Sequence, residues 1–176
     1  MNEKISTTIQ DLTITLRKVV GDDRGKIAEL LPGGFENPDA SVGIKHIYTS
    51  IATGLHTARA GHYHNRKGEF FYTVTGTALW VFYDFRKDSA TFGKTFSMVV
   101  GWSPFPGAAN QYVLEEGKMA QGWVPAGVYH VYWPLTAERV LVVCMATTPH
   151  DEDYVRIKPE EISEVAAEAR TYGIPI

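Results

Sequence analysis

The chain has 176 residues, of which 44% are hydrophobic and 21% are charged, and its net charge is −3. This composition is typical of a globular domain and provides no basic surface for nucleic acid or an anionic membrane. The N-terminus MNEKISTTIQ lacks the apolar core of a signal peptide, and no apolar run approaches the roughly 20 residues of a membrane helix. The lone cysteine, Cys144, excludes an internal disulfide. We therefore expect one cytoplasmic domain, residues 1–176.

Most of the chain has the pattern of β-strands. Residues 8–19 (TIQDLTITLRKV) alternate polar and apolar side chains, which is the period of a half-buried strand. Residues 44–52 are β-branched and aromatic, and residues 69–85 indicate two strands around the turn-like Thr75-Gly76-Thr77. Further strands are expected at residues 94–100, 110–115, 118–124, 128–133 and 138–147.

Two stretches break this pattern. Residues 101–109 (GWSPFPGAA) are rich in Gly and Pro and predict a loop. Residues 159–170 predict a helix, because Pro159 suits its first position and Arg170 its C-terminal end. One apolar stripe of this helix is expected to pack on the barrel: Ile162, Val165, Ala166 and Ala169. Many short strands with one helix predict an all-β sandwich or barrel, covering about residues 40–148.

Residues 62–76, HYHNRKGEFFYTVTG, contain the first part of a candidate metal site. Alternate residues of a strand share a face, so His62 and His64 point the same way. Glu69 follows after a short turn, and His130 opens a strand after the Pro/Gly turn of VPAGVYH. Three imidazoles and one carboxylate predict one divalent transition metal, with Zn²⁺, Ni²⁺, Fe²⁺ and Mn²⁺ as candidates.

These residues also carry a family resemblance. H-x-H-x4-E-x6-G followed by P-x-G-x-x-H resembles the two signature motifs of the cupin superfamily. The resemblance implies a jelly-roll barrel, the double-stranded β-helix, with the metal held by His62, His64, Glu69 and His130.

A second resemblance narrows the substrate class. Residues 21–30 (GDDRGKIAEL) resemble the D-x-R-G-x-x-x-E segment of sugar-nucleotide epimerases of the dTDP-4-dehydrorhamnose 3,5-epimerase type. Carried over, this implies that Arg24 and Glu29 contact the nucleotide-sugar. Arg59 matches the Arg of that family's R-G-x-H-Y motif, and an Arg fork suits phosphate. We expect Lys67 to bind substrate as well.

The chain departs from those epimerases at two catalytic positions. Glu69 stands where they have a catalytic Lys, and their catalytic Tyr falls at Val143. Those enzymes also work without metal. The D-D-R-G and H-x-H-x4-E motifs more closely resemble the zinc-bearing cupin domain of bifunctional capsule-biosynthesis epimerases. The 3,4-ketoisomerases of deoxysugar pathways share R-x-x-H-x-H and a segment similar to 151–154 (DEDY).

The resemblances imply an isomerase that acts on a 4-keto-6-deoxyhexose nucleotide by epimerisation or ketone migration. The keto group acidifies neighbouring C–H bonds, and a metal can stabilise the enolate as a Lewis acid. If His62 is a metal ligand, it cannot act as the base, and the candidates for the base are Tyr72, Tyr132 and Lys67. Tyr72 shares strand parity with Phe70 and not with Glu69, so it is expected to point away from the metal. Tyr132 shares strand parity with His130 and should point inward, so we expect Tyr132 to be catalytic. Without a metal, His62 is the natural base.

Alternative functions remain open on the sequence. TARAGHYH resembles a motif of cupin-type phosphoglucose isomerases, and a 3-His-1-Glu site can also serve a dioxygenase. A non-catalytic sugar-binding cupin is the third alternative, with tryptophans stacked on sugar: Trp80, Trp102, Trp123 and Trp133. We expect a homodimer, because relatives of this kind are often dimers and the N-terminal strand can cover a sheet edge.

Overall fold

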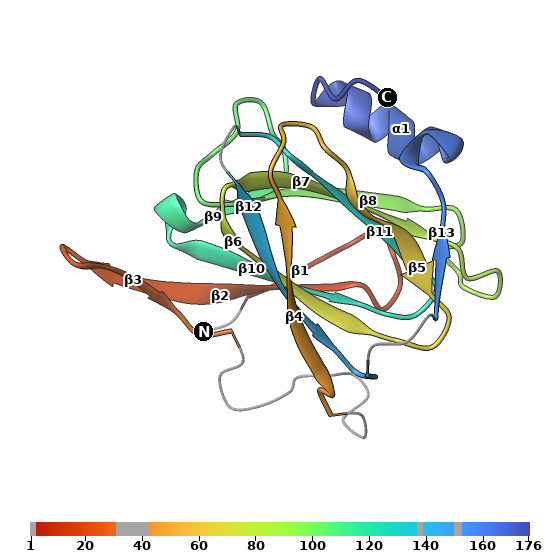
Figure 1. Ribbon diagram of the computed structural model, residues 1–176, viewed down its shortest axis with the longest axis horizontal. Coiled ribbons are helices and arrows are strands. Elements are labelled where there is room, and N and C mark those ends of the chain that lie inside the picture. The colour runs from red at the N-terminus through yellow and green to blue at the C-terminus, as the bar shows by residue number, and fades with distance from the viewer. Residues whose placement is uncertain (1–2, 31–42, 137–138, 150–152) are drawn as a thin grey trace.

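Two β-sheets face each other across the interior in the computed structural model, which describes residues 3–30, 43–136, 139–149 and 153–176 (Figure 1). Of the described strands, seven form the first sheet: β1 (Glu3–Ile5), β2 (Thr13–Asp22), β10 (Lys118–Val124), β6 (Glu69–Thr75), β12 (Val140–Ala146) and β4 (His46–Ala52), with β3 (Gly25–Ala28) paired to β2. Six form the second sheet: β13 (Tyr154–Arg156), β5 (Arg59–His64), β11 (Val128–Pro134), β7 (Thr77–Asp84), β8 (Thr95–Gly101) and β9 (Gln111–Val113).

The helical elements are short. They are the 3₁₀ turns η1 (Leu114–Glu116) and η2 (Pro159–Glu161), and the C-terminal helix α1 (Ser163–Thr171). The helix packs on the outer face of the second sheet, where Val165 and Ala169 are buried against Leu79, Val81 and Val99. The all-β jelly-roll class with a C-terminal helix, expected from the sequence, is confirmed. Among the described residues, no helix has the length and apolar character required to cross a bilayer.

The barrel interior is filled by side chains from both sheets. Phe71 and Val142 of the first sheet meet Trp80, Phe82 and Tyr132 of the second in one buried cluster. Each large apolar side chain buried in this way contributes about 1.5–3 kcal/mol. Beside the histidines this packing leaves a cavity that Phe71, Trp80 and Tyr132 line.

Most predicted strands are present, and two boundaries are corrected. The strand expected at residues 8–19 begins only at Thr13 and runs to Asp22. Its first residues form a turn instead, in which the Thr7 hydroxyl donates to the carbonyls of Ile9 and Leu12 (2.9 Å each) and Asp11 has φ +62°. The helix expected from Pro159 begins at Ser163, because Ile162 has extended backbone and the residues before it form a 3₁₀ turn.

Both motif glycines are explained by close approaches. Gly76 has φ +64°, and a Cβ there would lie 2.8 Å from the Arg139 carbonyl oxygen. Gly127 has φ +77°, and its Cβ would lie 2.4 Å from Cγ of Arg86. Only glycine suits such positions without strain.

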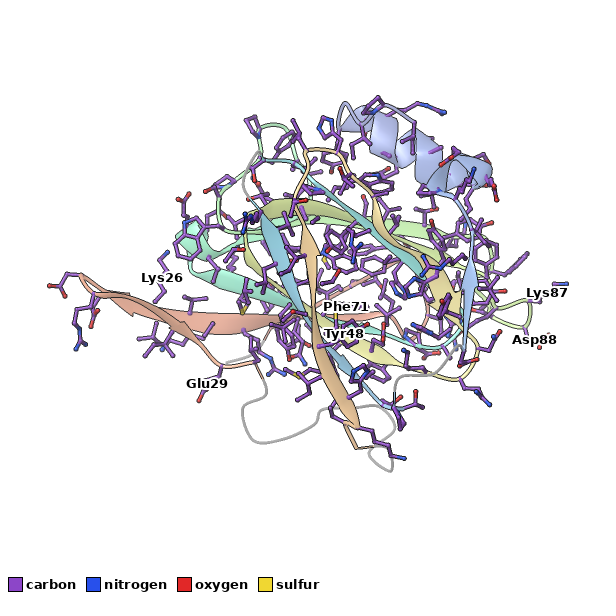
Figure 2. All side chains as sticks on the ribbon, in the orientation of Figure 1. Lys26, Glu29, Tyr48, Phe71, Lys87 and Asp88 are labelled. Atoms are coloured by element: carbon purple, nitrogen blue, oxygen red, sulfur yellow. The ribbon has the colours of Figure 1, made fainter. Side chains whose placement is uncertain are left out.

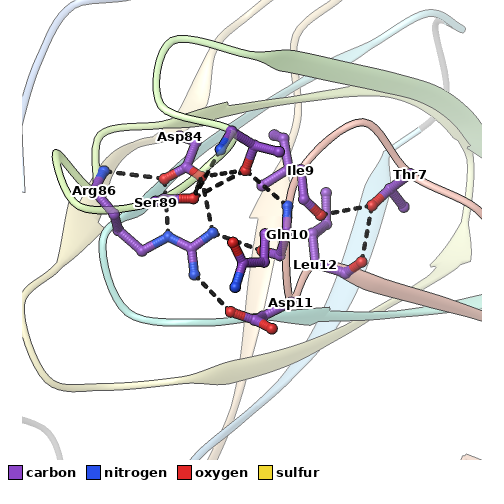
Figure 3. Close-up of polar contacts among 9 residues, drawn as sticks. Thr7, Ile9, Gln10, Asp11, Leu12, Asp84, Arg86 and Ser89 are labelled. Atoms are coloured by element: carbon purple, nitrogen blue, oxygen red, sulfur yellow. Dashed lines mark hydrogen bonds and ion pairs between the residues drawn. The ribbon is translucent and has the colours of Figure 1, made fainter.

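A polar network centred on the buried Asp84 fastens the turn before β2 to the barrel (Figure 3). Asp84 is fully buried and accepts hydrogen bonds from Arg86 Nε (2.8 Å), Ser89 Oγ (2.7 Å) and Thr91 Oγ1 (2.7 Å). Arg86 also donates to the Gln10 carbonyl (2.6 Å) and pairs with Asp11 (3.1 Å). Burial alone would raise the pKa of Asp84, but these donors lower it to about 2.

We predict that Asp84→Asn lowers the free energy of unfolding at pH 7 by about 2 kcal/mol, as expected for a carboxylate with so depressed a pKa. The pKa is lowered on folding, so the wild-type contribution is present above the unfolded value near 3.8 and is lost as pH falls toward 2. Urea denaturation between pH 7 and 2 measures both effects. Asp88→Asn, at an exposed position of the same loop, is the control. Equal losses in the two variants would contradict the assignment.

Candidate metal centre and active-site cavity

The structure brings the four predicted ligands together from three strands. His62 and His64 lie on β5, Glu69 begins β6, and His130 lies on β11 directly opposite His62. One ligand atom from each lies within 4.8 Å of all the others. Glu69 Oε2 is 3.4 Å from His64 Nε2 and 3.7 Å from His130 Nε2. A metal with bonds of about 2.1 Å separates its ligand atoms by about 3–4 Å, so these spacings suit one.

Hydrogen bonds to backbone carbonyls orient two of the rings. His64 Nδ1 lies 2.7 Å from the Asp153 carbonyl oxygen, and His130 Nδ1 lies 3.2 Å from that of Val128. A carbonyl only accepts, so Nδ1 carries the proton in each ring and Nε2 presents its lone pair to the cluster. Among the described residues, His64 Nε2 and Glu69 Oε2 are buried without a hydrogen-bond partner. This donor set fits a divalent transition metal.

The cluster's protonation also favours metal ligation. Burial and the neighbouring His64 lower the pKa of His62 to about 4. Burial and the charge of His62 lower that of His130 to about 3. Burial alone would raise the pKa of Glu69, but His64, His130 and Lys67 outweigh it and hold that pKa well below its ordinary value. At neutral pH, His62 and His130 are therefore neutral imidazoles beside the Glu69 carboxylate.

A cavity of about 230 Å³ opens beside the cluster. Its lining combines aromatic, polar and cationic side chains: Tyr48, Ser50, Ala58, Arg59, Ala60, His62, Phe71, Trp80, His130, Tyr132, Cys144 and Arg156. The Tyr132 hydroxyl shares a 2.8 Å hydrogen bond with Ser50 Oγ, and its ring packs 4.7 Å from that of Trp80. Burial raises the pKa of Tyr132, an effect that Ser50 and Arg59 partly offset.

The predicted substrate residues fall in three different places. Arg59 lines the cavity. Lys67 is buried beside Glu69, with Nζ 3.2 Å from Oε1, but it does not line the cavity. Arg24 and Glu29 lie on the arm formed by β2 and β3, which projects from the barrel, whereas Tyr48 and Phe71 lie in its middle (Figure 2). Arg24 is largely exposed there and pairs with Asp22 (2.5 Å).

The alternative catalytic tyrosine positions lie outside the cavity. Tyr72 donates to the Leu30 carbonyl and packs with Phe70 on the outer face of the first sheet, as its strand parity predicts. Val143 packs on that same outer face. Of the four tryptophans considered for sugar stacking, Trp80 alone lines this cavity. Asp151 and Glu152 of the DEDY segment lie outside the described residues.

Tyr48, Ser50 and Arg156 line the cavity although they were not predicted as site residues. Tyr48 and Ser50 face the interior from β4, and the alternation in HIYTS contained that information because residues 46, 48 and 50 share a face. Arg156 reaches the cavity from β13, and its guanidinium lies 4.9 Å from the centre of the Tyr154 ring. The strand that carries Arg156 has only three residues, which is too short for an alternation of polar and apolar side chains to be recognised in the sequence.

Two sheets closed around a histidine-rich cavity define a cupin-type jelly-roll barrel. The family model for dTDP-4-dehydrorhamnose 3,5-epimerase matches residues 6–165, and the chain therefore belongs to this family of isomerases. This confirms the resemblance inferred from the motifs. No curated protein matches the chain.

Solved structures with the same fold share little sequence with this chain. The dTDP sugar isomerase of Desulfovibrio desulfuricans G20 has a TM-score of 0.68 and 18% identity, with 87% of each chain covered. An epimerase from Legionella pneumophila, in complex with dTDP-4-keto-L-rhamnose, has a TM-score of 0.69 and 22% identity, covering 89% of this chain and 78% of that one. The 4-keto-6-deoxy sugar epimerase NovW of Streptomyces spheroides has a TM-score of 0.69 and 11% identity, covering 99% and 92%. At such identities the likeness establishes the fold.

Proposed function

We propose that this protein epimerises or isomerises a 4-keto-6-deoxyhexose nucleotide, with the sugar bound in the cavity beside the His/Glu cluster. The observation that carries the proposal is the family match over residues 6–165, together with a cavity that places Tyr132 and His62 in one lining. A 4-keto group makes the hydrogens on C3 and C5 acidic. Epimerisation removes one of these hydrogens as a proton and returns a proton to the opposite face of the same carbon. Ketone migration returns the proton at another atom, and positioned side chains can carry out either transfer.

Tyr132 is proposed as the residue that exchanges this proton. Its pKa is raised, so at neutral pH its hydroxyl is protonated and can return a proton to the enolate. It can remove a proton only as phenolate, a form that Ser50 and Arg59 favour. If no metal binds, neutral His62 has the free lone pair that a base needs.

The proposed cofactor is one divalent metal, with His62, His64, Glu69 and His130 as the residues that would hold it. Such a metal supplies positive charge as a Lewis acid where the enolate oxygen develops. Glu69 is central to this proposal, because a carboxylate at this position provides a metal ligand and cannot act as the cationic Lys of the rhamnose-pathway epimerases.

Arg59 and Arg156 are proposed to bind the diphosphate at the mouth of the cavity. Both side chains are exposed and line its edge, and within the described chain neither forms an ion pair with a carboxylate. The planar guanidinium matches phosphate oxygens bidentately.

A homodimer is proposed because, within one chain, two of the residues predicted to bind the nucleotide-sugar do not line the cavity. The projecting β2–β3 arm carries Arg24 and Glu29, and its apolar side chains Val20 (57%) and Ile27 (72%) are exposed. Covering this arm with a second chain would bury apolar surface and place those residues against the partner.

We predict that the purified protein contains one divalent metal per chain, and that removing it with a chelator lowers the melting temperature. Binding at about 100 times its dissociation constant stabilises the folded state by about 2.7 kcal/mol. His64→Gln removes one ligand and should abolish both effects. His56→Asn, at a histidine outside the cluster with φ +59°, should retain them. A wild-type protein that neither contains nor gains stability from Zn²⁺, Ni²⁺, Fe²⁺ or Mn²⁺ would refute the metal site.

We predict deuterium incorporation at C3 or C5 when the protein is incubated in D₂O with dTDP- or UDP-4-keto-6-deoxyglucose. Tyr132→Phe should slow this exchange by roughly 10²-fold or more. Tyr129→Phe removes a buried hydroxyl on the opposite face of the same strand and should leave the rate unchanged. NMR of the recovered sugar measures both. Absence of exchange with every 4-keto sugar nucleotide would exclude the proposal, and isomerisation of fructose 6-phosphate or oxygen consumption would indicate the alternative activities.

We predict a scattering mass of two chains in solution. Ile27→Asp places a charge on the exposed arm and should shift the mass toward one chain, because a buried unpaired carboxylate opposes association. Leu55→Asp, at a loop residue with 52% exposure, is the matched control and should remain dimeric. A wild-type mass equal to one chain at all concentrations tested would contradict the dimer.

A further inference from the structure

The two carboxylate oxygens of Glu69 have different surroundings. Oε1 accepts a hydrogen bond from the Tyr48 hydroxyl (2.9 Å) and lies 3.2 Å from Lys67 Nζ. Oε2 faces His64 Nε2 and His130 Nε2 and has no hydrogen-bond partner among the described residues. One oxygen is thus fully engaged by the protein, and the other is directed at the imidazole lone pairs.

The pair of charges beside the cluster is buried. The exposed fractions of Lys67 and Glu69 are 4% and 1%. An isolated buried charge is costly, and a close ion pair with further hydrogen bonds offsets that cost. Lys67 lies just before β6, and Tyr48 reaches the same oxygen from β4, so two separate segments fix one carboxylate atom.

We propose that Lys67 and Tyr48 are positioning residues that present Glu69 to a divalent cation through Oε2 alone, with Lys67 as the built-in counter-ion of the carboxylate. This inference rests on the proposed metal site. Lys67 neutralises Glu69 in the metal-free protein and so stabilises the empty cluster. The positive charge of Lys67 also repels an incoming cation, so it lowers the affinity of the site for the metal. Because Lys67 already offsets part of the Glu69 charge, a bound metal would keep more of its own positive charge to attract a substrate oxygen.

The two positioning residues therefore have opposite effects on metal affinity. Lys67→Met keeps the length of the side chain and removes its charge, so the metal-free protein should be less stable. In this variant the Glu69 carboxylate attracts the cation without the opposing charge of Lys67, and Zn²⁺ should bind roughly tenfold more tightly. Tyr48→Phe removes a neutral donor without changing the charge, so Glu69 loses orientation and Zn²⁺ should bind more weakly.

Competition for Zn²⁺ with a chromogenic chelator measures these affinities, and thermal melting with and without Zn²⁺ measures the accompanying stabilisation. The Zn²⁺-induced rise in melting temperature should increase in Lys67→Met and decrease in Tyr48→Phe. Tyr129→Phe, which removes a buried hydroxyl bonded to the Ile157 carbonyl, should match the wild type. If Lys67→Met fails to fold, Lys67→Gln keeps a donor while removing the charge, and the same increase is expected.

The outcomes separate this inference from the metal site itself. Wild-type protein that binds no divalent metal would refute both. If the wild type binds Zn²⁺ but the uncharged Lys67 variant binds it with equal or lower affinity, the counter-ion role of Lys67 is overturned and the metal site is not. Tyr48→Phe with wild-type affinity would overturn the positioning role of Tyr48. A lysine with a purely structural role would lower stability in the variant without raising its affinity for the metal.

Discussion

The carboxylate of Glu69 imposes the constraint on which the site depends. It is almost completely buried among three imidazoles, so its charge requires compensation inside the barrel. Lys67 and Tyr48 satisfy one oxygen, and the other faces His64 and His130 without a hydrogen-bond partner among the described residues. A barrel with a catalytic lysine at this position would itself carry the positive charge that an enolate needs. Here Glu69 occupies this position, and in the proposed mechanism the bound metal supplies that charge.

The surrounding structure holds this arrangement in place. Backbone carbonyls fix the tautomers of His64 and His130, so that lone pairs converge before any ligand arrives. The glycines of both motifs allow turns that other residues would obstruct. The Asp84–Arg86 network shares no residue with the cavity lining and anchors the turn that precedes β2, the strand that continues into the arm carrying Arg24. The polar network around Asp84 thus stabilises the fold, and a separate polar network around Glu69 forms the candidate site.

Period-2 alternation and motif spacing are local signals, so they predicted most of the barrel strands and the four residues of the cluster, but not the short strands β1, β3 and β13. These signals failed where long-range contacts decide the structure. Residues 8–12 have the strand period, but distant partners hold them in a turn, since the Thr8 hydroxyl donates to the Thr95 carbonyl (2.5 Å) and Arg86 donates to the Gln10 carbonyl (2.6 Å). The pairing of Lys67 with Glu69 and the approach of Tyr48 from β4 depend on tertiary packing. Strand parity nevertheless predicted the interior position of Tyr132 and the outer position of Tyr72.

The central claim is that Glu69 and the three histidines hold a metal next to the sugar cavity. X-ray diffraction from crystals of the purified protein, recorded on both sides of the metal's absorption edge, tests it most directly. The account predicts one anomalous peak per chain, bounded by His62, His64, Glu69 Oε2 and His130, with Lys67 still on Oε1. Crystals grown with added Zn²⁺ that show no peak within this cluster would contradict it.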